Sequence, residues 1–431
     1  MPCSAPLDAI LEGHLSLINI HVPSAGLLSE AGNKLYTGVR ATFCHLEWDL
    51  QEADPSKVPM FKDLQQQSTL CAGTLFTVDD FWSLARRARD YDARNHTFVA
   101  TKPHPDQPQS VPPSMVVFHE TRCGSTLVAN LLAAAFSPDK AKYPVEGEPS
   151  SSTSLHPAAR VYSESPPPVE ALKACEFNRR CDPGAQSALI RDVFYMMGRS
   201  PAVPKASKHY RFYKIQSIGV HSIHAFRQAM PNTPWMFVYR DSVEVIMSHF
   251  KNYLVGKQLS NSKMSVSNTP VCLRNYDSAT QPQILLDLLA EQHPGKAVSD
   301  LSKHDYCAAH LASLAESAVR EYKAQQDSQS SSAPPVWFVN YEQLPHIIWE
   351  RVLPQLLGSN FLTPQAIQRM KEVAHVYSKG RGSKAGEGWM QDSTLKQEKA
   401  PDAVKDAAKE YLKPVFDKME DIRKAEEAKH N

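Results

Sequence analysis

The chain has 431 residues, of which 42% are apolar and 22% charged, as in an ordinary globular protein with a sizeable core. Its formal net charge of +1 gives no reason to expect nucleic acid or an anionic membrane surface as a partner. The sequence has no recognisable signal peptide or membrane span, and its eight cysteines are scattered without metal-ligand spacing, so we expect a soluble cytoplasmic protein without a disulfide framework or a metal site.

The first part of the chain, residues 1–110, is a region to which the sequence assigns no role. It contains a strand-like stretch at 15–22 and, after Thr77, the pattern of a capped amphipathic helix. Prolines concentrated at 101–113 predict a stiff extended connector into the following segment.

Short apolar runs alternate with helical patterns from residue 114 onward. We predict strands at 115–118, 210–217, 235–239 and 336–340, and helices at 127–135, 185–198, 218–230, 243–253, 306–322 and 344–357. This alternation predicts an α/β fold with a parallel sheet covered by helices on both faces. The Ser- and Pro-rich residues 149–168 are predicted to form a surface loop, and residues 391–431 a charged C-terminal helix that is solvated or faces a partner.

The turn between the first of these strands and its helix has the composition of an anion-binding site. Such a turn directs backbone N–H groups and the positive end of the helix at one point, where Ser125 and Thr126 add hydroxyl donors and Arg122 adds a cation. We therefore expect a phosphate or a sulfate to be bound by Arg122, Cys123, Gly124, Ser125, Thr126 and Leu127. The loop of nucleotide hydrolases requires glycine and lysine at the positions that His119 and Ser125 occupy here.

A second polar pair follows the strand at 235–239. Arg240 closes that strand, and Ser248 lies eight residues later in the helix that follows. A phosphate between the two would receive a bidentate guanidinium and a hydroxyl donor. The alternative is a strand-terminal arginine that is paired with Asp241 or Glu244.

The order Arg-Cys-Gly-Ser-Thr-Leu at 122–127 resembles the 5′-phosphosulfate loop of the sulfotransferase family, with Cys123 in place of the usual serine. The interval from Arg240 to Ser248 resembles the 3′-phosphate motif of the same family, with Ser242 in place of the usual proline. The resemblance covers residues 114–390. It implies a P-loop sulfotransferase-like three-layer sandwich with a central parallel sheet, extended at the N-terminus, which transfers a sulfuryl group from 3′-phosphoadenosine 5′-phosphosulfate (PAPS) to a hydroxyl or amine.

The resemblance also implies roles for residues farther along the chain. Tyr341 would lie against the adenine, and a late basic loop with Lys379, Arg381 and Lys384 would close over the 3′-phosphate. Lys214 matches the lysine near the sulfuryl group of the cytosolic branch. Gln216 stands where that branch has its catalytic histidine.

A different proton acceptor is therefore needed. Glu148 resembles the glutamate that acts as general base in the tyrosylprotein and bacterial-type branch, and Glu146 is the reserve candidate. A solvated glutamate in a polar loop is the alternative for either residue. His119, His221 and His224 are further candidates, although we expect the last two to be structural histidines rather than metal ligands.

The expected mechanism follows from the charges. Arg122, Lys214 and the helix end would stabilise the negative charge that grows on the bridging oxygen, with no metal required. The acceptor, whether a small molecule, a carbohydrate or a peptide, is not identified by the sequence. A P-loop kinase or nucleotide hydrolase, and a catalytically silent nucleotide-binding protein of the same fold, remain the alternative functions.

Overall fold

The computed structural model describes residues 6–30, 34–97, 109–137, 158–176, 179–201, 209–250, 269–328, 333–376 and 392–429. Five of the residues singled out above lie outside these ranges, namely Glu146, Glu148, Lys379, Arg381 and Lys384.

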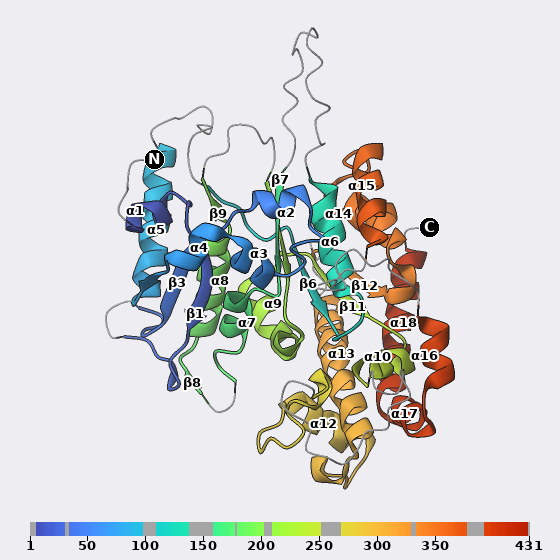
Figure 1. The fold of residues 1–431 in the computed structure, drawn as a ribbon. Helices are drawn as coiled ribbons and strands as arrows, with labels where there is room; N and C mark the ends of the chain where they lie inside the picture. Colours follow the sequence, from blue (N-terminus) through green and yellow to red (C-terminus); the bar gives the residue numbers. More distant parts are fainter. Residues whose placement is uncertain are drawn as a thin grey trace.

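A five-stranded sheet lies at the centre of the molecule (Figure 1). Its order is β12-β11-β6-β10-β7, and every neighbouring pair is parallel. The strands are β6 (Met115–His119), β7 (Ala158–Ser163), β10 (His209–Lys214), β11 (Trp235–Tyr239) and β12 (Val336–Asn340). All residues of β6 and β11 are buried, as is typical of parallel strands that are covered on both faces. The predicted α/β class and parallel sheet are confirmed.

Alternate side chains of β6 point into two different apolar cores. Met115 and Val117 pack with α6 (Ser125–Ala135) and α15 (Pro364–Ala374), on one face of the sheet. Val116 and Phe118 pack on the other face, in the core that includes α8 (Ala185–Met197), α9 (Ile223–Ala229) and α13 (Lys303–Asp327). This two-sided burial is what the period-two alternation of strand side chains requires.

One strand of the sheet lies in a segment that the sequence predicted as a surface loop. β7 occupies residues 158–163, and α7 (Pro166–Leu172) follows it. The prediction was wrong because the flanking serines and prolines dominate the composition, whereas Val161, Tyr162 and Leu172 are each at most 2% exposed. The three prolines at the start of α7 occupy its first turn, where a missing N–H costs nothing.

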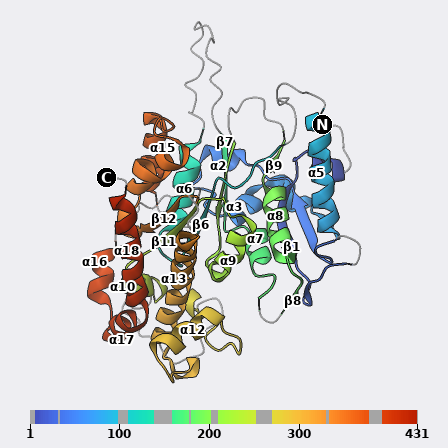
Figure 2. The ribbon, with the colours of Figure 1, turned by 180° about the vertical axis from the view of Figure 1, so that it is seen from behind.

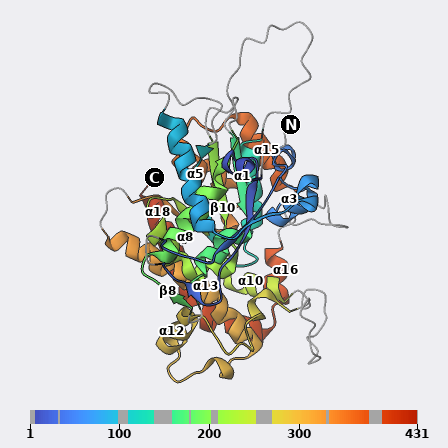
Figure 3. The same ribbon diagram turned by 90° about the vertical axis from the view of Figure 1, so that its left-hand side faces the viewer.

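The N-terminal region packs beyond the β7 edge of the sheet. It contains a small antiparallel sheet with the order β1-β3-β4, accompanied by helices. The elements of the region are α1 (Pro6–Leu11), β1 (Ser16–His21), β3 (Arg40–Cys44), α2 (Asp49–Ala53), α3 (Phe61–Gln67), α4 (Thr69–Gly73), β4 (Phe76–Val78) and α5 (Phe81–Thr97). The strand and the helix predicted in this region are thus present. Figure 3 looks onto this side of the molecule, along which α5 runs.

The C-terminal helices lie at the opposite edge, beyond β12 (Figures 1 and 2). They are α16 (Ser393–Lys399), α17 (Asp402–Ala407), a π-helical turn (Ala408–Leu412) and α18 (Lys413–Ala428). Glu420 of α18 accepts hydrogen bonds from Tyr239 (2.7 Å) and Asn340 (2.8 Å), the last residues of β11 and β12. One face of the charged C-terminal helix is therefore fastened to the sheet.

The remaining elements connect these parts. They are β2 (Gly26–Leu27), β5 (Gln109–Ser110), β8 (Arg180–Cys181), β9 (Arg199–Ser200), a 3-10 helix (Ser217–Ser222), α10 (Ser242–His249), α12 (Gln283–Gln292), short 3-10 turns at Val271–Leu273, Val298–Asp300 and Tyr341–Gln343, a π-helical turn (Ile348–Val352) and α14 (Leu353–Leu357).

Three disulfides contradict the expectation of a chain without a disulfide framework. They join Cys44 to Cys71, Cys175 to Cys181 and Cys272 to Cys307. Separation along the sequence concealed two of these pairs, since the fold brings cysteines 27 and 35 residues apart to Cα distances of 5.1 and 5.0 Å. Among the described residues, none of the helices has the length and apolar character needed to cross a bilayer.

Candidate functional site

The turn between β6 and α6 occupies the topological switch point of the sheet. β7 and β10 lie on one side of β6, whereas β11 and β12 lie on the other. Open α/β sheets bind ligands in the crevice at the carboxyl ends of the strands beside such a point. The predicted strand, turn and helix are therefore present where a ligand is expected.

The backbone of this β6–α6 turn is shaped to gather N–H groups. Arg122 (φ 65°) and Gly124 (φ 89°) both adopt the left-handed conformation, which is strained for the arginine. Gly124 is the N-cap of α6, and its carbonyl accepts from the Leu127 amide at 2.9 Å. The amides of Ser125 and Thr126 come before the first helical hydrogen bond, so they and the helix dipole can hold an anion.

A buried carboxyl group, which the sequence analysis did not single out, supports the turn. Glu120 is 0% exposed, and one of its carboxyl oxygens accepts from the backbone N–H of Arg240 at 3.3 Å. Burial raises the pKa of Glu120 well above its usual value, although the hydrogen bond from Arg240 acts in the opposite direction. The folded environment therefore favours the neutral, protonated form of this side chain. The Cys123 thiol donates to the Glu120 carbonyl at 3.0 Å, and Thr121 contacts His249 of α10.

Tyr341 and Arg240 lie beside the glycine of the turn. A Cβ atom added to Gly124 would lie 2.7 Å from Cδ2 of Tyr341, so the ring packs directly on the glycine. The guanidinium carbon of Arg240 is 4.0 Å from the centroid of the same ring. The structure thus brings together three residues that follow three neighbouring strands, β6, β11 and β12.

The guanidinium of Arg240 is already paired with acidic groups. It is 4% exposed; Nε donates to Glu244 (2.7 Å), and Nη2 donates to Asp392 (2.8 Å). The pairing with Glu244 is the alternative that the sequence left open. Desolvation lowers the pKa of Arg240, but its hydrogen bond to Asp392 and its other partners outweigh this effect and raise it. The structure does not bring Ser248 to the guanidinium, because its hydroxyl donates to the Glu244 carbonyl at 2.8 Å.

A second ionic pair lies at the carboxyl ends of β7 and β10. Lys214, predicted near the sulfuryl group, is 1% exposed and donates to the carboxylate of Glu164. Glu164 follows β7 directly and has a left-handed backbone (φ 57°). Nε2 of His119 lies 3.9 Å from the same carboxylate. Glu164 was not singled out from the sequence because β7 was not predicted. Had the strand been recognised, a charged residue at its end would have indicated Glu164, as it did Lys214.

Met60 brings the N-terminal region to this site. The sulfur of Met60, which is 6% exposed, lies 4.0 Å from the hydroxyl of Thr126 and 3.6 Å from that of Ser163. These contacts join the start of α6 to the end of β7. The region without an assigned role thus contributes a wall beside the turn.

The two histidines expected to be structural both contact α13. His221 bonds to Ser313 at 2.9 Å, and His224 lies 3.2 Å from Glu321. Burial lowers the pKa of His221 to about 3 and that of the neighbouring His310 to about 4. Among the described residues, no group of three or more His, Cys, Asp and Glu side chains could hold a metal ion.

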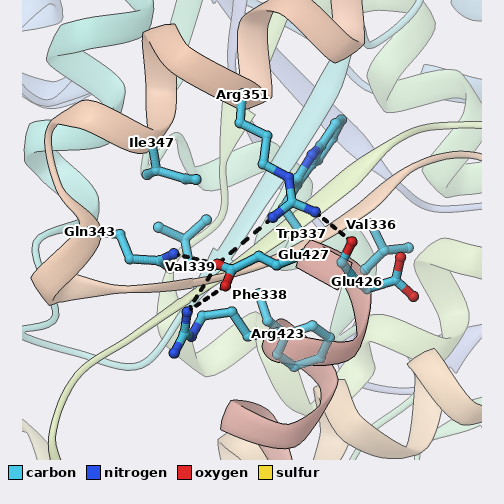
Figure 4. A pocket seen from close by; sticks show the side chains of 10 residues that line it. All are labelled: Val336, Trp337, Phe338, Val339, Gln343, Ile347, Arg351, Arg423, Glu426 and Glu427. Carbon is cyan, nitrogen blue, oxygen red and sulfur yellow. Dashed lines mark hydrogen bonds and ion pairs between the residues drawn. The ribbon is translucent and has the colours of Figure 1, made fainter. Parts of the chain in front are cut away.

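A small cavity beside β12 is lined by ion pairs (Figure 4). Arg423 donates to Glu427 at 2.9 Å, Gln343 donates to the same carboxylate at 2.7 Å, and Arg351 donates to the Glu426 carbonyl at 2.8 Å. The space holds about one water molecule. These groups pair with one another and fasten α18 to the edge strand, so we do not regard the cavity as a ligand site.

Comparison with known proteins provides no relative from which to assign the chain. No family model, curated protein or solved structure matches it.

Proposed function

We propose that this chain is a sulfotransferase that transfers the sulfuryl group of PAPS to a hydroxyl or amine acceptor. The observation that carries the proposal is the convergence of Gly124, Tyr341 and Arg240 at the carboxyl ends of adjacent strands. The 5′-phosphosulfate would lie against the amides of the β6–α6 turn, with Arg122, Ser125 and Thr126. The adenosine would lie against Tyr341, and its 3′-phosphate would bind Arg240. On this proposal the fold is a sulfotransferase-like three-layer sandwich.

The proposed reaction is an in-line displacement at sulfur. The acceptor oxygen or nitrogen bonds to sulfur while the bond from sulfur to the bridging phosphate oxygen breaks, which releases adenosine 3′,5′-bisphosphate. Arg122, Lys214 and the positive end of α6 would stabilise the negative charge on that oxygen. The acceptor proton passes to a carboxylate.

Nucleotide selectivity tests the proposal. We expect adenosine 3′,5′-bisphosphate to bind more tightly than 5′-AMP or magnesium ATP in titration calorimetry. Arg240→Ala should weaken bisphosphate binding at least about tenfold, because charge-assisted hydrogen bonds are lost, while leaving 5′-AMP unaffected. Arg191→Ala, an exposed arginine of α8, is the matched control.

Preference for magnesium ATP would instead identify a P-loop kinase or nucleotide hydrolase. Bisphosphate binding without turnover on any acceptor would identify a silent binding protein. Binding of none of the three nucleotides would reject the proposal.

Three glutamates are candidates for the role of base. Glu148 remains our sequence-based candidate, with Glu146 in reserve, and Glu164 is the carboxylate that the structure adds beside Lys214. The variant that removes the base, Glu148→Gln or Glu164→Gln, should abolish turnover and leave bisphosphate affinity unchanged. Equal turnover in both variants and the wild type would rule out both residues.

The cellular compartment also needs revision. The cytoplasmic location was predicted from scattered cysteines, but three disulfides are typical of proteins that fold in an oxidising compartment. We therefore propose an oxidising compartment for this chain.

A further inference from the structure

The first turn of α16 docks on α10 through a compact polar network. Asp392 immediately precedes α16 and bonds to Arg240, as described above. Ser393 donates from its hydroxyl to the Glu244 carboxylate at 2.9 Å and lies 3.4 Å from Nη2 of Arg240. Lys396, one turn farther along α16, is 2.7 Å from the second carboxylate oxygen of Asp392. Together with the hydrogen bond that Gln397 donates to Asp241 (2.6 Å), these charged and polar groups form the contact between the two helices.

The Asp392 carboxylate bridges two buried cations while being exposed itself. Arg240 and Lys396 are each 4% exposed, whereas the Asp392 side chain is 41% exposed. Desolvation raises the pKa of Asp392, but hydrogen bonds from Lys396 and Arg240 outweigh it, so the pKa is lowered and the group is ionised. Each carboxylate oxygen binds one cation, which is how two oxygens of a phosphate would bind the same pair.

We propose that Arg240, Lys396 and Ser393 form a phosphate-binding site that the Asp392 carboxylate fills as an internal ligand, and that an incoming phosphate takes its place. Identifying this phosphate as the 3′-phosphate of the nucleotide rests on the proposed function; the exchange itself does not. Asp392 is the exposed member and can move into solvent. Glu244 continues to hold Nε of Arg240, so the guanidinium keeps its orientation during the exchange.

An internal ligand weakens the apparent affinity for an external one, because only the fraction of molecules with the site open can bind. Asp392→Asn removes the competing charge and leaves Arg240 and Lys396 without their shared anion. We expect this variant to bind phosphate at least about tenfold more tightly than the wild type. It should also be less stable than the wild type without phosphate, since unpaired buried charges are costly.

Thermal unfolding in sodium phosphate, against sodium chloride of equal ionic strength, measures the exchange. The melting temperature of Asp392→Asn should rise more with phosphate than that of the wild type. The added change Lys396→Met should remove this extra rise. Asp402→Asn, an exposed acid at the start of α17, is the control and should behave as the wild type. An equal response of Asp392→Asn and the wild type would overturn the proposal.

A measurement on the wild type covers the case in which the variant does not fold. Saturating phosphate should raise the pKa of Asp392 toward its ordinary value in a carboxyl NMR titration, because its carboxylate no longer accepts from Lys396 and Arg240. An unchanged Asp392 pKa, with phosphate bound, would also overturn the proposal.

Nucleotide binding to the same variants separates this inference from the proposed function. If phosphate gives the expected response but adenosine 3′,5′-bisphosphate binds no better than 5′-AMP, the anion site stands and the proposed function fails. If the bisphosphate is preferred but Asp392→Asn changes neither its affinity nor the phosphate response, the proposed function stands and the internal ligand is rejected.

Discussion

Glu120 connects the β6–α6 turn to the end of the neighbouring strand β11 by a hydrogen bond, and its carboxyl group is buried. One carboxyl oxygen accepts from Arg240, and the other has no hydrogen-bond partner among the described residues. The pKa of Glu120 is raised well above its usual value, and burial is the largest cause. The unfolded chain releases this proton near pH ~4.3, whereas the folded protein retains it to a higher pH. The stability that this group contributes is therefore complete below that pH and is lost as the pH rises toward the folded pKa.

Glu120→Gln should accordingly stabilise the protein at neutral and alkaline pH. The amide keeps the size of the acid and its acceptor oxygen but does not ionise in the unfolded chain. The gain in unfolding free energy over the wild type should grow with pH above ~4.3, with a slope of up to about 1.4 kcal/mol per unit. Urea denaturation of both proteins between pH 5 and pH 8 measures it.

The exposed Glu342→Gln provides the matched control, and its difference from the wild type should not grow in this way. Buried histidines such as His221 also make the folded protein less stable as the pH falls below ~6.5. This effect is the same in every variant, so it cancels when the unfolding free energies of variant and wild type are subtracted. A difference for Glu120→Gln that is independent of pH would show that Glu120 ionises in the folded protein.

At the scale of elements, the edge strand β7 is completed by a side chain. The amide of Gln51, 5% exposed, donates to the Val161 carbonyl at 2.9 Å and accepts from the Val161 N–H at 3.0 Å. These are the two bonds that a neighbouring strand would make, so α2 covers a pairing edge that would otherwise be open. Glu164 directly follows this strand.

Sequence reasoning located four of the five sheet strands because each is a short buried apolar run. The predicted ranges 235–239 and 336–340 coincide with β11 and β12. β7 escaped because an arginine interrupts it and prolines follow it, and Glu164 was missed with it. The turn at Gly124 was predicted because its left-handed backbone favours glycine, and a glycine can be read directly from the sequence.

Long-range pairing limits what the sequence could predict. Pairing of Arg240 with Asp241 or Glu244 was the alternative that the sequence offered, and Glu244 is a partner, but Asp392 lies 152 residues away and no local pattern indicates it. The same limit concealed two of the three disulfides, Cys44–Cys71 and Cys272–Cys307, whose partners the fold brings together. Ser248 matched a motif by spacing, yet its hydroxyl bonds within its own helix, as serines inside helices commonly do.

At the scale of the whole molecule, the disulfides fasten structure on both sides of the sheet. The Cys44–Cys71 bond closes the N-terminal region, and the Cys272–Cys307 bond fastens the segment before α12 to the long helix α13. Constraining an unfolded chain stabilises the folded one more when the closed loop is longer.

Replacing the Cys272–Cys307 pair by alanines should therefore destabilise the protein more than replacing the Cys175–Cys181 pair. The closed loops span 35 and 6 residues, which correspond to costs of about 4 and about 2 kcal/mol. Burial acts in the same direction, because Cys272 and Cys307 are at most 1% exposed and their loss also leaves a cavity. Urea denaturation measures both costs. A thiol titration of the denatured wild type that detects all eight cysteines would contradict the disulfides themselves, whereas equal costs for the two pairs would contradict only the loop-length argument.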